Sequence, residues 1–226
     1  MCRSLGRFLD FIRLFSLLLC LFAVFAGAGC RTLVSKKTPE PGRKWICDHV
    51  ADEVMLGGDY EAGISLHERF LEKEPENALA LYHLGYAYGQ IGEHLREVSY
   101  YEKAIVLGFR EEGMFFNMGM TYCEIGQAEK ATSAFKEALK INPGSADNHF
   151  GLGMAYHITV TNGLAEEELL KAIEIDPRHA DARLLLSLLY ADWGELQKAA
   201  GQLRKVLEID PTNDRARKFL ERIEKE

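Results

Sequence analysis

The sequence predicts an all-α protein built from five consecutive helix–turn–helix units. The first observation is a period of 34 residues that links Pro143, Pro177 and Pro211. Each of these prolines follows a similar helix end, "EALKINP", "KAIEIDP" or "KVLEIDP". Two earlier steps of the period lead to Phe109, which departs from the pattern, and to Pro75, which follows "RFLEKEP". A repeat of this length is typical of stacked helical units that bury their apolar faces against one another.

Glycines and aromatic residues recur on the same frame. A small residue that lets two helices approach closely is expected at Ala51, Gly85, Gly119, Gly153 and Ser187. Three residues further on stand Val54, Tyr88, Tyr122, Tyr156 and Tyr190. Turn glycines are expected at Gly58, Gly92, Gly126 and Gly194. The fourth unit lacks this glycine, and we expect a late turn at Asn162-Gly163 instead.

These positions resemble the tetratricopeptide repeat, a helix–turn–helix unit of 34 residues. The resemblance covers five units, at residues 44–77, 78–111, 112–145, 146–179 and 180–213. It implies a right-handed superhelical solenoid with a concave and a convex surface. Residues 214–226 place Phe219, Leu220 and Ile223 on one side among charged residues, which predicts a C-terminal capping helix.

The N-terminus, residues 1–29, has the layout of a signal peptide. Three arginines precede "LFSLLLCLFAVFAGAG", an apolar run that ends in small residues. Gly27-Ala28-Gly29-Cys30 resembles the lipobox of bacterial lipoproteins, although that family usually has an aliphatic residue where Gly27 stands. The resemblance implies cleavage before Cys30, a diacylglycerol on its thiol and an acyl chain, such as palmitate, on its amino group. Residues 30–43 then form a flexible basic tether at the periplasmic face, and Arg31 favours the outer membrane.

Two alternatives for this segment stay open. Ala26-Gly27-Ala28 is also an A-x-A site, so that cleavage before Gly29 would release a soluble exported protein. An uncleaved anchor is the other alternative, because the basic residues after the apolar run outnumber those before it. The positive-inside rule would then keep the repeats in the cytoplasm, as a membrane-anchored adaptor.

The resemblance also implies which residues meet a partner, because first helices line the concave side in this family. The stripe consists of Tyr82, Tyr86, Phe116, Met120, Phe150, Met154, His157, Leu184 and Leu188. It lacks the Lys, Asn and Arg with which some members grip a C-terminal carboxylate. Aromatic and methionine side chains suit an apolar or amphipathic segment of a protein partner. We therefore expect an interaction scaffold similar to the small repeat lipoproteins that help to assemble secretion or pilus machinery.

The sequence gives little indication of chemistry. The formal charge is −7, and residues 30–226 have 24 basic and 33 acidic residues, a balance of −9 that argues against nucleic-acid binding. Neither HExxH, a phosphate loop nor GxSxG occurs. His49 and His83 share one frame position, but no cysteine or carboxylate is expected beside them to complete a metal site. We thus expect no catalytic residues, cofactor or metal, with a regulatory subunit of an enzyme as the remaining alternative.

Overall fold

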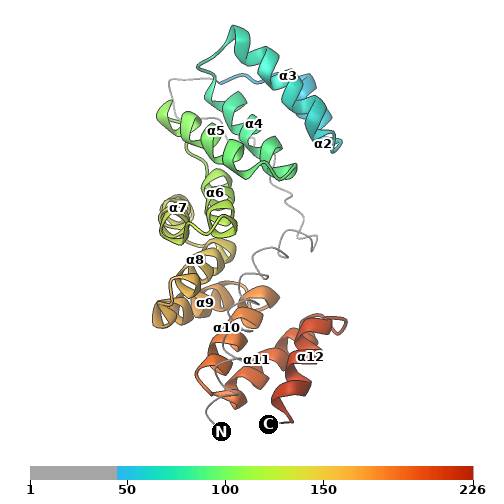
Figure 1. Ribbon diagram of the computed structural model, residues 1–226, viewed down its shortest axis with the longest axis vertical. Coiled ribbons are helices and arrows are strands. Elements are labelled where there is room, and N and C mark those ends of the chain that lie inside the picture. The colour runs from blue at the N-terminus through green and yellow to red at the C-terminus, as the bar shows by residue number, and fades with distance from the viewer. Residues whose placement is uncertain (1–44, 226) are drawn as a thin grey trace. The chain divides into compact units, whose positions relative to one another are not determined.

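The computed structural model describes residues 45–225, and all regular secondary structure in this part of the chain is helical (Figure 1). It forms two compact units, the first reaching Gln127 and the second beginning at Ala128. The first unit contains α2 (His49–Leu56), α3 (Tyr60–Lys73), α4 (Ala78–Gln90), α5 (His94–Val106) and α6 (Glu112–Glu124). The second contains α7 (Ala128–Ile141), α8 (Ala146–Ile158), α9 (Asn162–Ile175), α10 (Ala180–Asp192), α11 (Leu196–Ile209) and α12 (Asp214–Ile223). The expected all-α fold class is confirmed.

Helix starts follow the 34-residue period. From α4 onward, alternate helices begin at Ala78, Glu112, Ala146, Ala180 and Asp214. In four of these five, the residue before the helix caps it, since a side-chain atom accepts a hydrogen bond from the backbone N–H three residues on. The capping residues are Asn77, Ser145, His179 and Asn213. The period is therefore marked by side-chain capping at the helix N-termini as well as by apolar packing.

The turn inside each repeat is a Schellman motif. At Gly126 the backbone N–H donates to the Cys123 carbonyl, and the following N–H of Gln127 donates to Tyr122. The same pair of bonds closes the turns at the other three expected glycines, and all four have positive φ, from 74° to 86°. Glycine adopts this conformation without steric cost, which confirms the turn assignment.

The fourth repeat keeps this turn without its glycine. Val160 occupies the glycine position at φ 58°, and its N–H donates to the His157 carbonyl. The late turn expected at Asn162-Gly163 is wrong, because both residues lie in the first turn of α9. A β-branched side chain in the left-handed region is a genuine backbone outlier.

The small residues of the frame lie where helices touch. A Cβ added to Gly85 of α4 would come within 2.7 Å of the Tyr101 ring on α5, and one on Gly153 of α8 within 2.9 Å of Leu169 on α9. The departure at Phe109 also has a physical reason. Gly108, at φ 89°, ends α5 in place of a proline, and the buried Phe109 ring stacks on Tyr82 at 5.1 Å.

Consecutive repeats are joined through the recurring tyrosines. The Tyr88 hydroxyl on α4 donates to Glu68 of α3 at 2.7 Å, and Tyr122 on α6 donates to Glu102 of α5 at 3.2 Å. In the second unit, Tyr190 on α10 donates to Glu166 of α9 at 3.0 Å. Burial of these rings against the preceding helix places one polar atom at the edge, where the glutamate satisfies it.

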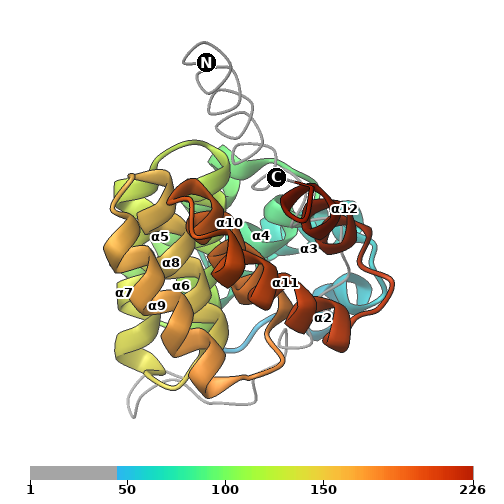
Figure 2. The ribbon, with the colours of Figure 1, turned by 90° about the horizontal axis from the view of Figure 1, so that it is seen from below.

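The last helix covers the apolar end of the second unit, where α10, α11 and α12 follow one another (Figure 2). Ala216 of α12 joins the buried cluster of Leu184, Leu203 and Val206. The side chains expected to form the apolar side of this helix, those of Phe219, Leu220 and Ile223, pack against the same cluster.

The signal peptide, Cys30 and the basic tether lie outside the described residues. Among residues 45–225, none of the helices has both the length and the apolar character that crossing a bilayer requires.

Candidate functional site

The predicted partner-binding residues of the first unit divide into two kinds. Tyr82 and Tyr86 on α4 are buried, Tyr82 against Phe109 and Tyr86 edge-on to Tyr60 at 6.2 Å. Phe116 and Met120 on α6 are half-buried. The two tyrosines therefore contribute to packing within the unit, whereas the α6 pair keeps part of its surface exposed.

The second unit shows the same division. Met154 on α8 and Leu184 on α10 are buried, whereas Phe150, His157 and Leu188 are half-buried. Burial lowers the pKa of His157 even though the charge of Asp192 acts in the opposite direction, so the imidazole is neutral at physiological pH. The binding role of the nine residues stays a prediction, and the half-buried residues are those that a partner could reach.

A separate depression lies in the first unit between α3, α4 and α5, with a volume of about 780 Å³. Its wall includes Leu71, Leu84 and Val106, and the Val106 side chain is 85% exposed. Glu68 and Glu72 line it as well. This is an apolar hollow with acidic residues along it, and its lining residues are not among those predicted from the sequence to bind a partner.

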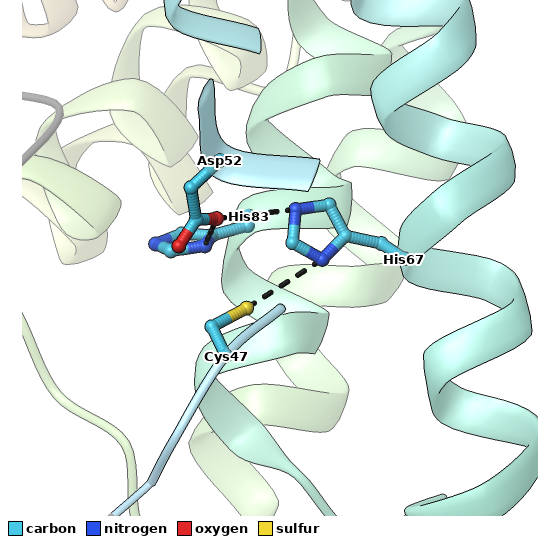
Figure 3. A group of neighbouring side chains, drawn as sticks. All are labelled: Cys47, Asp52, His67 and His83. Carbon is cyan, nitrogen blue, oxygen red and sulfur yellow. Dashed lines mark hydrogen bonds and ion pairs between the residues drawn. The ribbon is translucent and has the colours of Figure 1, made fainter. Parts of the chain in front are cut away.

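A compact polar cluster lies at the start of the described chain (Figure 3). Cys47 comes from the segment before α2, Asp52 from α2, His67 from α3 and His83 from α4. One ligand atom from each side chain lies within 4.8 Å of the others. His67 is fully buried and His83 is 9% exposed, so the cluster is largely shielded from water.

The cluster is centred on the Asp52 carboxylate and the His67 ring. Asp52 Oδ1 is 2.7 Å from His83 Nδ1 and 3.4 Å from His67 Nε2, while Cys47 Sγ is 3.5 Å from His67 Nδ1. Both contacts of Asp52 are ion pairs by distance, yet Asp52 Oδ1, His67 Nε2 and His83 Nδ1 lack a hydrogen bond of good geometry. The polar atoms thus converge without well-aligned hydrogen bonds between them.

The charges of the cluster favour a carboxylate and a neutral thiol. Burial alone would raise the pKa of Asp52, but the ring nitrogens of His67 and His83 outweigh it and hold that pKa well below its usual range. Burial raises the pKa of Cys47, and the charge of Asp52 raises it further. Cys47 and Cys123 are both free cysteines.

Sequence reasoning missed this cluster because it compared equivalent frame positions. The premise that no cysteine or carboxylate accompanies His83 is wrong, since Cys47 and Asp52 lie beside it. His49, its frame equivalent, is exposed and contacts Glu53 at 3.7 Å. His67 links the others, but it lies on a second helix and its equivalents in the later repeats are not histidines: Tyr101, Phe135, Leu169 and Leu203. The signal that the sequence did offer was His67 itself, a histidine at a position of α3 that faces the core.

Comparisons with known families agree with the repeat geometry. Family models for the tetratricopeptide repeat match residues 52–110, 113–145 and 162–214, which together are more than half of the chain. The chain belongs to the tetratricopeptide repeat family. The comparison with curated proteins found no match to this tetratricopeptide repeat protein.

Solved structures show the same fold. MamA is 25% identical, with a TM-score of 0.69 over 75% of this chain and 99% of its own. YrrB, a TPR protein with an unusual peptide-binding site, is 23% identical, with a TM-score of 0.67 over 74% of this chain and 86% of its own. PilW, a widely conserved type IV pilus biogenesis factor, is 21% identical, with a TM-score of 0.62 over 71% and 74%. This tetratricopeptide repeat protein is therefore a protein–protein interaction scaffold in its architecture.

Proposed function

We propose that this tetratricopeptide repeat protein is a non-enzymatic, membrane-tethered scaffold that binds an apolar or amphipathic segment of a cell-envelope protein. The observation that carries the proposal is the set of apolar and aromatic side chains left half-buried on the first helices of repeats three to five. Its members are Phe116 and Met120 in the first unit and, in the second unit, Phe150, His157 and Leu188.

The chemistry of this set favours an apolar partner surface. Methionine and aromatic side chains adapt to irregular apolar shapes, and removing their remaining exposed area from water stabilises a complex. The neutral state that burial gives His157 fits the same environment. The architecture of YrrB, with its peptide-binding site, and of PilW, a pilus biogenesis factor, supports testing peptide segments of envelope assembly proteins first.

The tether is proposed from the sequence around Cys30. Two or three acyl chains would give a stable anchor, whereas a single chain is marginal. The 14 residues 30–43 would let the repeats range over about 20 Å as a flexible chain. Intact mass of protein extracted from membranes tests this. The tether requires a chain that begins at Cys30 with two or three acyl chains.

The other masses would contradict the lipid tether in different ways. An unmodified chain beginning at Gly29 would indicate a soluble exported protein. A full-length unmodified chain would indicate an uncleaved anchor with repeats facing the cytoplasm. A Cys30→Ser variant serves as the control, because it removes the acylated thiol and leaves the described residues unchanged.

Partner binding is tested with two charge substitutions. Met120→Glu and Leu188→Glu each place a carboxylate on a half-buried apolar position of a first helix, and each should weaken capture of the partner. Leu95→Glu is the matched control, since Leu95 is 75% exposed on the second helix α5. Capture that survives both substitutions, with the helical circular dichroism unchanged, would refute the proposed role of the half-buried first-helix residues in partner binding.

The depression of the first unit offers a second candidate surface. Val106→Glu adds a like charge beside Glu68 and Glu72 and removes an exposed apolar contact. Loss of capture in this variant alone would move the binding surface to α3–α5 while leaving the scaffold function in place.

A further inference from the structure

We propose that Cys47, Asp52, His67 and His83 form a structural Zn²⁺ site that closes the N-terminal end of the repeat array. The four side chains converge from the segment before α2 and from three successive helices, as Figure 3 shows. A site at this end of the fold is independent of the proposed partner.

The donor set fits zinc better than the hard divalent cations. A thiolate, two imidazoles and a carboxylate supply one sulfur, two nitrogens and one oxygen, all of which are zinc ligands in proteins. Mg²⁺ and Ca²⁺ prefer oxygen ligands alone, so this mixed set selects against them. With Cys47 and Asp52 anionic and both histidines neutral, the ligands carry two negative charges, which equal the charge of the ion.

The distances are close to those of a tetrahedral site. Bonds of about 2.0–2.3 Å to zinc place neighbouring ligand atoms about 3.3–3.8 Å apart. The Cys47–His67 and Asp52–His67 contacts, at 3.5 and 3.4 Å, already fall in this range. These two contacts use different nitrogens of His67, and a ring gives a metal only one. The largest separation between ligand atoms, 4.8 Å, needs to shrink by about 1 Å for tetrahedral coordination, which a small rotation of one side chain achieves.

The burial of the cluster provides an independent reason. His67 is fully buried, and its Nε2 and His83 Nδ1 lie 3.4 and 2.7 Å from Asp52 Oδ1, yet none of these three buried atoms makes a hydrogen bond of good geometry. Buried polar atoms are almost always hydrogen-bonded, so three such atoms gathered in one place call for a common ligand. A cation satisfies all three at once, because each offers a lone pair.

A Cys–His–Asp nucleophilic triad is the competing interpretation of three of these residues. It leaves His83 without a role, although His83 Nδ1 is only 2.7 Å from Asp52. The zinc site instead gives all four side chains a role.

The location of the cluster gives the site its role. The first repeat of an array has no preceding repeat to cover it, and terminal repeats require a cap. Zinc would tie the segment at Cys47 to α2, α3 and α4 in one step. The same segment is already held by Asn77, whose side-chain amide donates to the Ile46 carbonyl at 2.9 Å. The ion would thus fix the segment at Cys47 against the first helices of the fold.

The experiment uses the full chain, purified without a histidine tag and stripped with a chelator. Zn²⁺ is titrated by calorimetry, and Co²⁺ is then used as a spectroscopic probe of tetrahedral sulfur and nitrogen ligation. We expect one Zn²⁺ per chain, tetrahedral cobalt bands with a thiolate charge-transfer band, and a rise in Tm on zinc addition.

Matched variants identify the ligands. Cys47→Ser and His83→Asn should each weaken Zn²⁺ binding by more than about 100-fold, since even residues that only support metal ligands cost 10–100-fold. Cys123→Ser and His49→Asn should bind as the parent does, because Cys123 is a cysteine away from the cluster and His49 is the exposed frame equivalent of His83. Circular dichroism of the metal-free variants shows that loss of binding is not loss of fold.

Three results would overturn the proposal. The first is the absence of saturable Zn²⁺ binding in the folded parent, which would reduce the cluster to a polar network. The second is binding that Cys47→Ser and His83→Asn leave unchanged. The third is a Co²⁺ spectrum without tetrahedral bands or a thiolate charge-transfer band, which would contradict zinc ligation by these four residues.

Discussion

Replacing Val160 by glycine should stabilise the protein. A left-handed backbone conformation costs an L-residue about 1–2 kcal/mol, because Cβ approaches the following carbonyl oxygen. The Val160 side chain is 71% exposed, so its removal forfeits little apolar burial. Glycine also gives the unfolded chain more conformational entropy, which lowers the stability by about 0.5–1 kcal/mol. The expected net gain is about 0.5–1 kcal/mol.

Urea unfolding followed by circular dichroism measures this change. Val160→Gly should raise the midpoint with an unchanged m-value and raise Tm by about 1–4 °C. Val160→Ala is the control, because it keeps the Cβ that causes the strain and should gain less than glycine. Gly126→Ala, at the equivalent turn with φ 74°, should lose about 1 kcal/mol. If Val160→Gly is no more stable than Val160→Ala, the strain argument is refuted.

The remaining predictions concern helix packing and pH. Gly85→Ala should destabilise the fold by about 1–3 kcal/mol, because its Cβ would lie 2.7 Å from the buried Tyr101 ring. Gly201→Ala, on α11 with open space around it, should stabilise the fold by about 0.5–1 kcal/mol. If urea unfolding shows the same change in stability for both variants, this packing argument is contradicted. Burial, with a neighbouring glutamate adding to it, raises the pKa of Tyr88, Tyr122 and Tyr190 from 10.0 to about 12. The contribution of these tyrosines to stability is therefore present below pH 10 and is lost as the pH rises through 12. Ultraviolet titration of the folded protein should show this late ionisation, and replacing one of the tyrosines by Phe should reduce the loss of stability at alkaline pH.

The repeated helix ends could be predicted from sequence because each depends on local chemistry. A turn with positive φ selects glycine, so the spacing of glycines is enough to locate four of the turns. The turn of the fourth repeat was misplaced because Val160 adopts the same conformation as the turn glycines when the flanking hydrogen bonds hold it. The glycine signal at Gly163 then indicated a turn that packing of the pair α8 and α9 overrides.

Side-chain environments were harder to predict because they depend on helix rotation and on distant residues. The period located Tyr82 and Met120 on equivalent faces, but it could not show that Phe109 would cover Tyr82. The cluster at Cys47 and His67 joins residues from different frame positions, 20 residues apart in the chain. Only the tertiary packing of α2, α3 and α4 brings them together.

The central claim is that the half-buried apolar residues of the first helices hold a protein partner in the cell envelope. The most direct measurement is site-specific photo-crosslinking in intact cells, with the reactive residue placed at Met120 or Leu188 and, for comparison, at Leu95. We expect one shared envelope-protein crosslink from Met120 and Leu188 and none from Leu95. A crosslink to that protein from Leu95 alone, or no crosslink from either first-helix position, would contradict the claim.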